Sequence, residues 1–202
     1  MTVFFQYCSY GFSNCYILGL EEKKTAIIVD PGSMENITLE TIENNNFELK
    51  AVFITHDHLS HVRGLRTLKR IYNAEVFAVN HSILDHKTTM VKDGDRINTS
   101  GFSVEVISIP GHSSDSVIYK IRGMLFTGDV LTAGLVGSTA SAYGAATQMN
   151  KLRSRLLSLP GDYIVLPGHG PPSTLEAERR FNTDIFHYDQ NRSKRPMFRV
   201  DV

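Results

Sequence analysis

Residues 51–61 read AVFITHDHLSH, an apolar run that ends at Thr55 and delivers three histidines within six residues. His56 and His58 stand two positions apart where a strand would end, and imidazoles so placed converge on one ion because the chain there leaves regular pairing. His61 falls where the following helix begins, so it can face a neighbouring ion. Three unrelated core histidines in so short a span would be a coincidence, and the cluster therefore predicts metal binding.

Three more polar side chains stand just beyond apolar runs, and each follows a glycine. They are His112, Asp129 and His169. A glycine lets the backbone turn sharply and approach closely, and ligands gather at strand ends in layered α/β folds. Together with the first cluster these residues supply five imidazoles and one carboxylate, which is enough for two ions.

Short runs rich in Val, Ile and Phe predict strands along most of the chain. Several runs are almost continuously apolar, as expected of strands that are covered on both faces. The predicted strands are 3–7, 14–18, 25–29, 51–54, 75–79, 102–109, 117–121, 124–126 and 163–166.

Helical patterns lie between these runs. Apolar residues recur at helical spacing within 62–72 and within 149–159. Ser173 followed by Glu176 forms a capping box that opens a helix through Arg180. The irregular alternation of strands and helices predicts a mixed α/β (α+β layered) domain rather than a helical bundle or an all-β barrel.

The composition is that of a globular chain without a dominant charge. Of 202 residues, 42% are hydrophobic, and 21 basic side chains balance 21 acidic ones. We expect one domain over residues 1–202 with a basic tail from about residue 191, and no nucleic-acid partner. No apolar run of about 18 residues occurs, so no membrane contact is expected, and the start shows no export signal. Cys8 and Cys15 lack CxxC spacing and fit reduced thiols in a cytoplasmic protein.

These motifs resemble those of the metallo-β-lactamase superfamily. That family carries T-H-x-H-x-D-H, then a histidine after Pro-Gly, an aspartate after Gly and a last histidine in P-G-H-G. This chain also matches the pattern at residues 14–16, 29–32 and 178–180. The resemblance covers nearly the whole chain, and it implies a four-layer αββα sandwich with metals at one edge between two β-sheets.

The resemblance implies six metal ligands, three for the first metal, two for the second and one shared. They are His56, His58 and His112 for the first metal, His61 and His169 for the second, and the bridging Asp129. Asp30 matches an aspartate that supports the metal loop by hydrogen bonding, with a surface-turn aspartate as the alternative. The other histidines, His81, His86 and His187, match no ligand position.

The chain departs from the family pattern at Ser60, where the family has an aspartate that binds the second metal. Two divalent ions carry four positive charges and Asp129 cancels one, so the site should recruit an anion such as hydroxide, phosphate or peroxide. Ser60 would leave the second ion open to that ligand. Tyr143 is either a hydrogen-bond donor over the open position or a packed loop tyrosine. Asp57, at the variable position, is expected to be solvated or to support a ligand.

From the sequence we favour a non-haem diiron centre that binds oxygen, as a peroxo adduct, and acts as an oxygen or redox sensor. Imidazole donors suit iron, with zinc or manganese as alternatives. The chain resembles stand-alone oxygen-binding diiron proteins, which carry the metal domain of flavodiiron proteins without flavodoxin. Flavodiiron proteins, however, have glutamate at the position of His58. The resemblance implies a chemotaxis or signalling partner or an electron donor, and it leaves a homo-oligomer open.

The alternative function is hydrolysis of a thioester or an ester, because the chain also resembles small glyoxalase II-like enzymes. The complete first-metal set and the stretch 167–174, PGHGPPST, favour this function. Ser60 and the stretch 137–146, GSTASAYGAA, depart from that branch. A degenerate scaffold that holds one metal or none ranks third, because five histidines are retained.

Overall fold

The computed structural model describes the backbone of residues 1–190. The expected basic tail from about residue 191 lies outside the described residues, and the single domain over 1–202 stays a prediction. Within residues 1–190, no helix has the length and apolar character needed to cross a bilayer.

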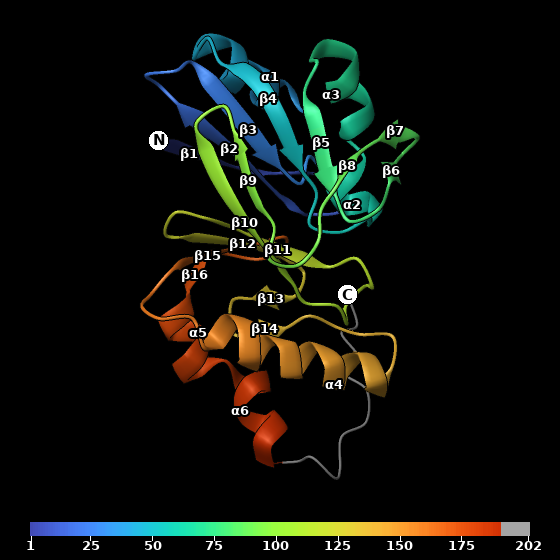
Figure 1. The fold of residues 1–202 in the computed structure, drawn as a ribbon, viewed down its shortest axis with the longest axis vertical. Coiled ribbons are helices and arrows are strands. Elements are labelled where there is room, and N and C mark those ends of the chain that lie inside the picture. The colour runs from blue at the N-terminus through green and yellow to red at the C-terminus, as the bar shows by residue number, and fades with distance from the viewer. Residues whose placement is uncertain (191–202) are drawn as a thin grey trace.

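The first sheet has six strands, with helices on its outer face (Figure 1). Strands β1 to β3 pair antiparallel, and β3, β4, β5 and β8 then pair parallel. In spatial order the strands are β1 (Thr2–Tyr7), β2 (Asn14–Leu20), β3 (Thr25–Val29), β4 (Glu48–Phe53), β5 (Glu75–Ala78) and β8 (Thr89–Met90). The helices of this half are α1 (Asn36–Asn44), α2 (Leu59–Val62) and α3 (Leu65–Ile71).

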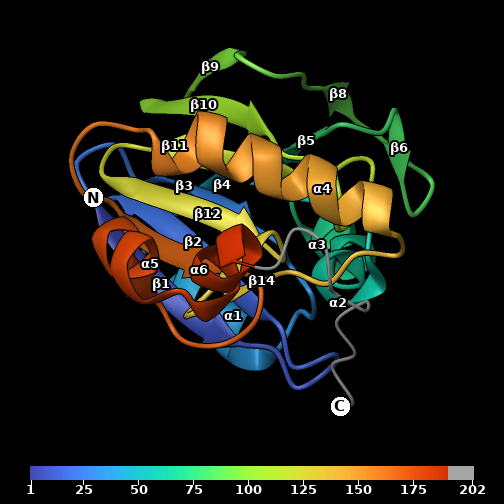
Figure 2. The ribbon, with the colours of Figure 1, turned by 90° about the horizontal axis from the view of Figure 1, so that it is seen from below.

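The second sheet also has six strands and lies against the first, and α4 crosses its outer face (Figure 2). In spatial order its strands are β16 (Ser173–Thr174), β15 (Ile164–Pro167), β12 (Met124–Gly128), β11 (Val117–Ile121), β10 (Phe102–Ser108) and β9 (Arg96–Thr99). Its helices are α4 (Ala142–Lys151), which continues as a π-helix over Leu152–Leu157, α5 (Leu175–Phe181) and α6 (Thr183–Gln190). Two small hairpins complete the fold, β6 (Ser82–Ile83) with β7 (His86–Lys87) and β13 (Leu131–Thr132) with β14 (Leu135–Val136).

Three apolar layers separate the four structural layers, and they follow from the alternation of side chains along each strand. In β3, Ile28 joins the cluster under the first helices, whereas Ile27 joins the cluster between the sheets. In β12, Phe126 joins the cluster between the sheets, whereas Leu125 joins the cluster that includes the π-helix. Both faces of these strands are therefore buried, which accounts for the continuous apolar runs. The predicted four-layer αββα sandwich is confirmed.

The predicted helix over 62–72 is two helices, α2 and α3. In a continuous helix Gly64 N would donate to Ser60 O, but it donates instead to Pro31 O at 2.8 Å. The Ser60 carbonyl accepts from Ser13 Oγ at 2.5 Å. A side chain 47 positions away in the sequence thus ends α2.

The other two helix predictions were right in place and wrong in their ends. The helix expected over 149–159 begins earlier, at Ala142, because the Ser141 side chain accepts from Gly144 N. The cap of α5 is Thr174, whose side chain accepts from Ala177 N at 3.1 Å. Ser173 is not the cap, because its hydroxyl donates to Glu178.

Replacing Phe53 with alanine should remove the main contact between the two sheets. The fully buried Phe53 ring stacks on Phe77 with 4.8 Å between centroids, and it meets Tyr119 of the other sheet at 5.0 Å. We expect Phe53→Ala to lower the free energy of unfolding by about 3–5 kcal/mol, measured by urea denaturation. The half-exposed Ile71 offers a matched control, and Ile71→Ala should cost less than about 1 kcal/mol. Equal losses for the two variants would contradict this view of the core.

Candidate metal centre

The six predicted ligands lie at one edge of the sandwich, where strands of both sheets end. Backbone hydrogen bonds join the sheets there, from Val117 N to Thr55 O at 2.9 Å and from Asn14 N to Gly168 O at 2.7 Å. The strand ends therefore cannot move apart independently. The candidates are His56 and His58 after β4, His61 in α2, His112 after β10, Asp129 after β12 and His169 after β15.

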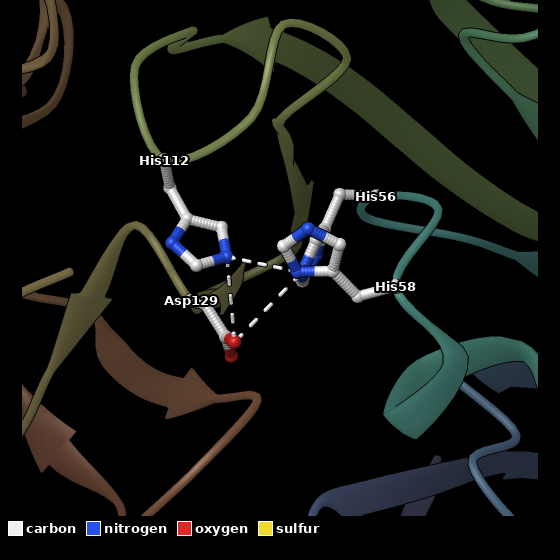
Figure 3. Close-up of side chains that lie close together, drawn as sticks. All are labelled: His56, His58, His112 and Asp129. Carbon is white, nitrogen blue, oxygen red and sulfur yellow. Dashed lines mark hydrogen bonds and ion pairs between the residues drawn. The ribbon is translucent and has the colours of Figure 1, made fainter. Parts of the chain in front are cut away.

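Three histidines and Asp129 form the first group (Figure 3). His58 Nδ1 lies 2.9 Å from His56 Nε2 and 3.1 Å from His112 Nε2. Asp129 Oδ2 lies 3.7 Å from His56 Nε2 and 3.6 Å from His112 Nε2. Four ligands at 2.0–2.1 Å from a tetrahedral ion would be about 3.3–3.4 Å apart. The group has the dimensions of such a site.

The second group comprises His61, His169 and the same aspartate. Asp129 Oδ1 lies 3.3 Å from His61 Nε2, and Asp129 Oδ2 lies 3.5 Å from His169 Nε2. Gly168 permits this approach, because a β-carbon there would lie 2.5 Å from both Asp129 Oδ1 and His61 Cε1. The carboxylate therefore stands between the two groups, in the place expected of a bridge.

Hydrogen bonds at Nδ1 aim two of the buried rings inward. The Thr55 hydroxyl donates to Asp30 Oδ2 at 2.7 Å, so its oxygen accepts from His56 Nδ1 at 3.0 Å. His61 Nδ1 donates to Asp30 Oδ2 at 3.1 Å. Both rings therefore carry their neutral-state proton on Nδ1 and present the Nε2 lone pair to the site. Asp30, which also accepts from Thr55 N at 2.8 Å, supports the metal loop as predicted.

The two less buried rings are oriented by backbone carbonyls. His112 Nδ1 donates to Ser138 O at 2.9 Å, and His169 Nδ1 donates to Phe12 O at 3.0 Å. Four of the five imidazoles thus turn a lone pair inward through Nε2, and His58 does so through Nδ1. The sequence did not identify Ser138 or Phe12, because any residue supplies a carbonyl.

Several of the inward atoms are not satisfied by hydrogen bonds among the described residues. Among the described residues, His61 Nε2 and Asp129 Oδ1 are two of three buried side-chain polar atoms with no hydrogen-bond partner. His56 Nε2 and His112 Nε2 both face His58 Nδ1, which has one proton at most and can satisfy only one of them. Converging acceptors of this kind are repulsive unless a cation lies between them. The residues present therefore fit two metal ions.

Burial and charge set the protonation of the two most buried rings. Burial lowers the pKa of His56 to about 3, with the nearby His61 adding to the shift, so this ring stays neutral and able to ligate. Burial opposes charge on His61 as well, but its contacts with Asp129 and Asp30 outweigh burial and raise its pKa to about 10. The same contact with His61 outweighs burial at Asp129 and holds the pKa of that carboxyl below its ordinary value. The surroundings of His61 thus favour a positive charge next to its ring, and a bound metal ion would supply that charge.

The remaining candidates lie outside these groups. The Tyr143 side chain is 82% exposed, and its hydroxyl has no hydrogen-bond partner in the part of the chain that the structure describes. Ser60 is partly buried and its hydroxyl likewise makes no hydrogen bond within residues 1–190, so both roles stay predictions. Asp57 is exposed, and its backbone N donates to Asp115 at 2.8 Å. The other histidines, His81, His86 and His187, belong to neither group.

A four-layer αββα sandwich with five histidines and a shared aspartate at the edge between its sheets has the residues of a dinuclear metal site. The sequence profile of the metallo-β-lactamase superfamily matches residues 9–169, which is most of the chain. The chain belongs to this superfamily, and the family and the cluster together indicate a dinuclear metal site.

The chain is similar to several named members of the superfamily. A hydroxyacylglutathione hydrolase of Aeromonas salmonicida is 33% identical over 161 residues, which are 79% of this chain and 62% of that enzyme. Hydroxyacylglutathione hydrolase GloC of Haemophilus influenzae is 30% identical over 193 residues, 84% of this chain and 91% of the enzyme. The crystal structure of TTHA1623 in a di-iron-bound form superposes with a TM-score of 0.74 at 25% identity, over 90% of this chain and 99% of that one.

Replacing Asp129 should empty both metal positions, because it is the one residue common to the two groups. We expect Asp129→Ala to lose both ions, measured as metal per chain by inductively coupled plasma mass spectrometry after purification. The exposed Asp162 offers a control, and Asp162→Ala should keep the metal content of the native chain. An Asp129→Ala chain that retained two ions would refute the bridging role.

Proposed function

We propose that the chain is a metal-dependent hydrolase of a thioester, with a hydroxyacyl thioester of glutathione as its substrate. The observation that carries this proposal is the convergence of six donors, of which His61 Nε2 and Asp129 Oδ1 are buried without a hydrogen-bond partner among the described residues. The names of the two relatives support the reaction class. Because the chain spans 62% of the Aeromonas enzyme, the substrate and its recognition are part of the proposal.

A pair of divalent ions at this edge would supply an activated water near neutral pH and positive charge for the developing oxyanion. The chain's own residues prepare that site. Asp30 and Thr55 hold His56 and His61 in a single tautomer, so no ring has to turn when a substrate arrives. Asp129 is the only carboxylate among the six donors, so the site stays strongly positive and attracts an anionic thioester.

The cellular location of the protein is a further part of the proposal. Both cysteines, Cys8 and Cys15, are buried and unpaired. We infer that the protein works in the cytoplasm, where thiols stay reduced.

Protein loaded with zinc should hydrolyse a hydroxyacyl thioester of glutathione, measured by loss of thioester absorbance. A chelator should abolish the activity, and added zinc should restore it. Ser60→Asp, which returns an anionic donor to the second position, should raise turnover about tenfold. Tyr143→Phe, a change at an exposed ring, is purified and assayed in the same way. It tests whether the Tyr143 hydroxyl contributes to turnover. Zinc-loaded native and Ser60→Asp proteins that both left the thioester intact would refute the proposal.

A second candidate is the oxygen-binding diiron centre favoured by the sequence. The five imidazole donors are the specific observation for it, because nitrogen donors suit ferrous iron as well as zinc. The di-iron-bound structure of TTHA1623 supports iron as a metal for this fold. In this function oxygen is the ligand, and a signalling protein or an electron donor is the partner.

The behaviour of the iron-loaded protein in air distinguishes the two proposed functions. If the second one is correct, protein reduced and loaded with ferrous iron without oxygen should develop a visible charge-transfer band on exposure to air. The band should be absent from the Asp129→Ala variant, which is expected to hold no iron pair. Stoichiometric zinc after expression in iron-rich medium, together with efficient thioester turnover, would exclude the oxygen-binding function.

A further inference from the structure

The loop that follows Asp129 folds back onto it. The backbone of Gly137 packs against the Asp129 carbonyl so closely that a β-carbon at Gly137 would lie 1.7 Å from Asp129 O. Gly137 N also donates to Val130 O at 3.1 Å. The position of Asp129 therefore depends on where Gly137 is held.

Gln148 of α4 holds Gly137. Its side chain is completely buried, and Nε2 donates to Gly137 O at 2.8 Å and approaches Val130 O at 3.5 Å. One amide thus fixes both ends of the small loop, next to Asp129 on one side and next to Ser138 on the other. Ser138 O is the acceptor that orients His112.

The same side chain also braces the loop that carries His112. Gly111 precedes that histidine, and a β-carbon at Gly111 would lie 2.4 Å from Gln148 Cβ and 2.9 Å from Gln148 Oε1. Gln148 is therefore in contact with the backbone on one side of His112 while it fixes the carbonyl partner on the other.

The Gln148 amide is oriented so that its NH2 group donates, although this leaves its own oxygen unpaired. Gln148 Oε1 is buried without a hydrogen-bond partner, which is unfavourable. Turning the amide over would not help, because the oxygen would then face the carbonyls of Gly137 and Val130. An apolar side chain of the same length would remove the unpaired oxygen but would leave Gly137 O without its donor.

We propose that Gln148 is a positioning residue for the metal centre, acting on the bridging Asp129 and on His112 without touching an ion. This inference rests on the metal centre proposed above and adds a residue that the family motif does not contain. Its effect should appear in metal affinity and in ligand geometry, and not only in the stability of the fold. Mutation of a residue that supports a metal ligand typically weakens metal binding by about 10–100-fold.

The test compares Gln148→Met, which keeps the length and loses the donor, with Leu156→Ala. Leu156 is a fully buried residue of the π-helix that continues α4, so its loss reports general destabilisation. Zinc affinity is measured by competition with a chromophoric chelator, and ligand geometry by the visible spectrum of the cobalt-loaded proteins. We expect Gln148→Met to bind zinc 10–100-fold more weakly and to shift the cobalt bands, whereas Leu156→Ala lowers unfolding stability and leaves both readouts unchanged.

Native affinity and cobalt spectrum in Gln148→Met would overturn the inference, and so would equal changes in the two variants. If the methionine variant does not fold, Gln148→Asn withdraws the amide by one methylene and is judged by the same criteria. Failure of the native protein to bind zinc or cobalt would instead refute the metal centre itself, so the two failures are distinguishable.

Discussion

The buried carboxylate of Asp30 is the interaction on which the metal edge depends. Asp30 leaves β3 with a φ of +50°, and it accepts from Thr55 N, from the Thr55 hydroxyl and from His61 Nδ1. Because the hydroxyl donates to Asp30, its oxygen is left to accept from His56 Nδ1. One anion thereby sets the tautomer of a ligand for each proposed ion. It also strengthens His61 as a donor to metal, since a carboxylate partner raises the basicity of the opposite nitrogen.

Asp30 can act in this way only because the sheets are tied together beside it. Tyr119 of the second sheet donates to Ile54 O at 2.9 Å, next to the histidine loop, and Tyr16 of the first sheet donates to Pro167 O at 2.7 Å, next to His169. Burial raises the pKa of both phenols, so both remain donors across the usual pH range. The two bonds cross the core in opposite directions. They join the strand ends that carry the ligands, so the metal edge is a property of the whole sandwich.

The candidate ligands, which the structure brings together in two groups, could be picked out in the sequence because each is a chemically distinctive side chain close behind an apolar run. The supporting contacts could not. His112 and His169 are oriented by the carbonyls of Ser138 and Phe12, which carry no side-chain signal. The break between α2 and α3 depends on a hydroxyl far away in the chain. Gln148 resembles any polar residue of an amphipathic helix until its contacts are known. The nine predicted strands were right in place because burial on both faces leaves a strong pattern, whereas the more exposed edge strand β9 and two-residue strands such as β6 and β13 leave none.

The electrostatics of the site also bear on which of its two proposed functions ranks first. Two divalent ions would bring four positive charges. The carboxylates of Asp129 and Asp30, which contact the ligand histidines, would balance only two of them. An anionic occupant is therefore favoured in either case. A glutathione thioester is anionic when it arrives, and water completes its hydrolysis without another reactant. Oxygen is neutral and would be bound as an anion only if both ions were ferrous and could each give up one electron. Hydrolysis needs no change of oxidation state, so it does not depend on one metal in one oxidation state. For that physical reason, and not only because of the named relatives, we rank hydrolysis first among the two proposed functions.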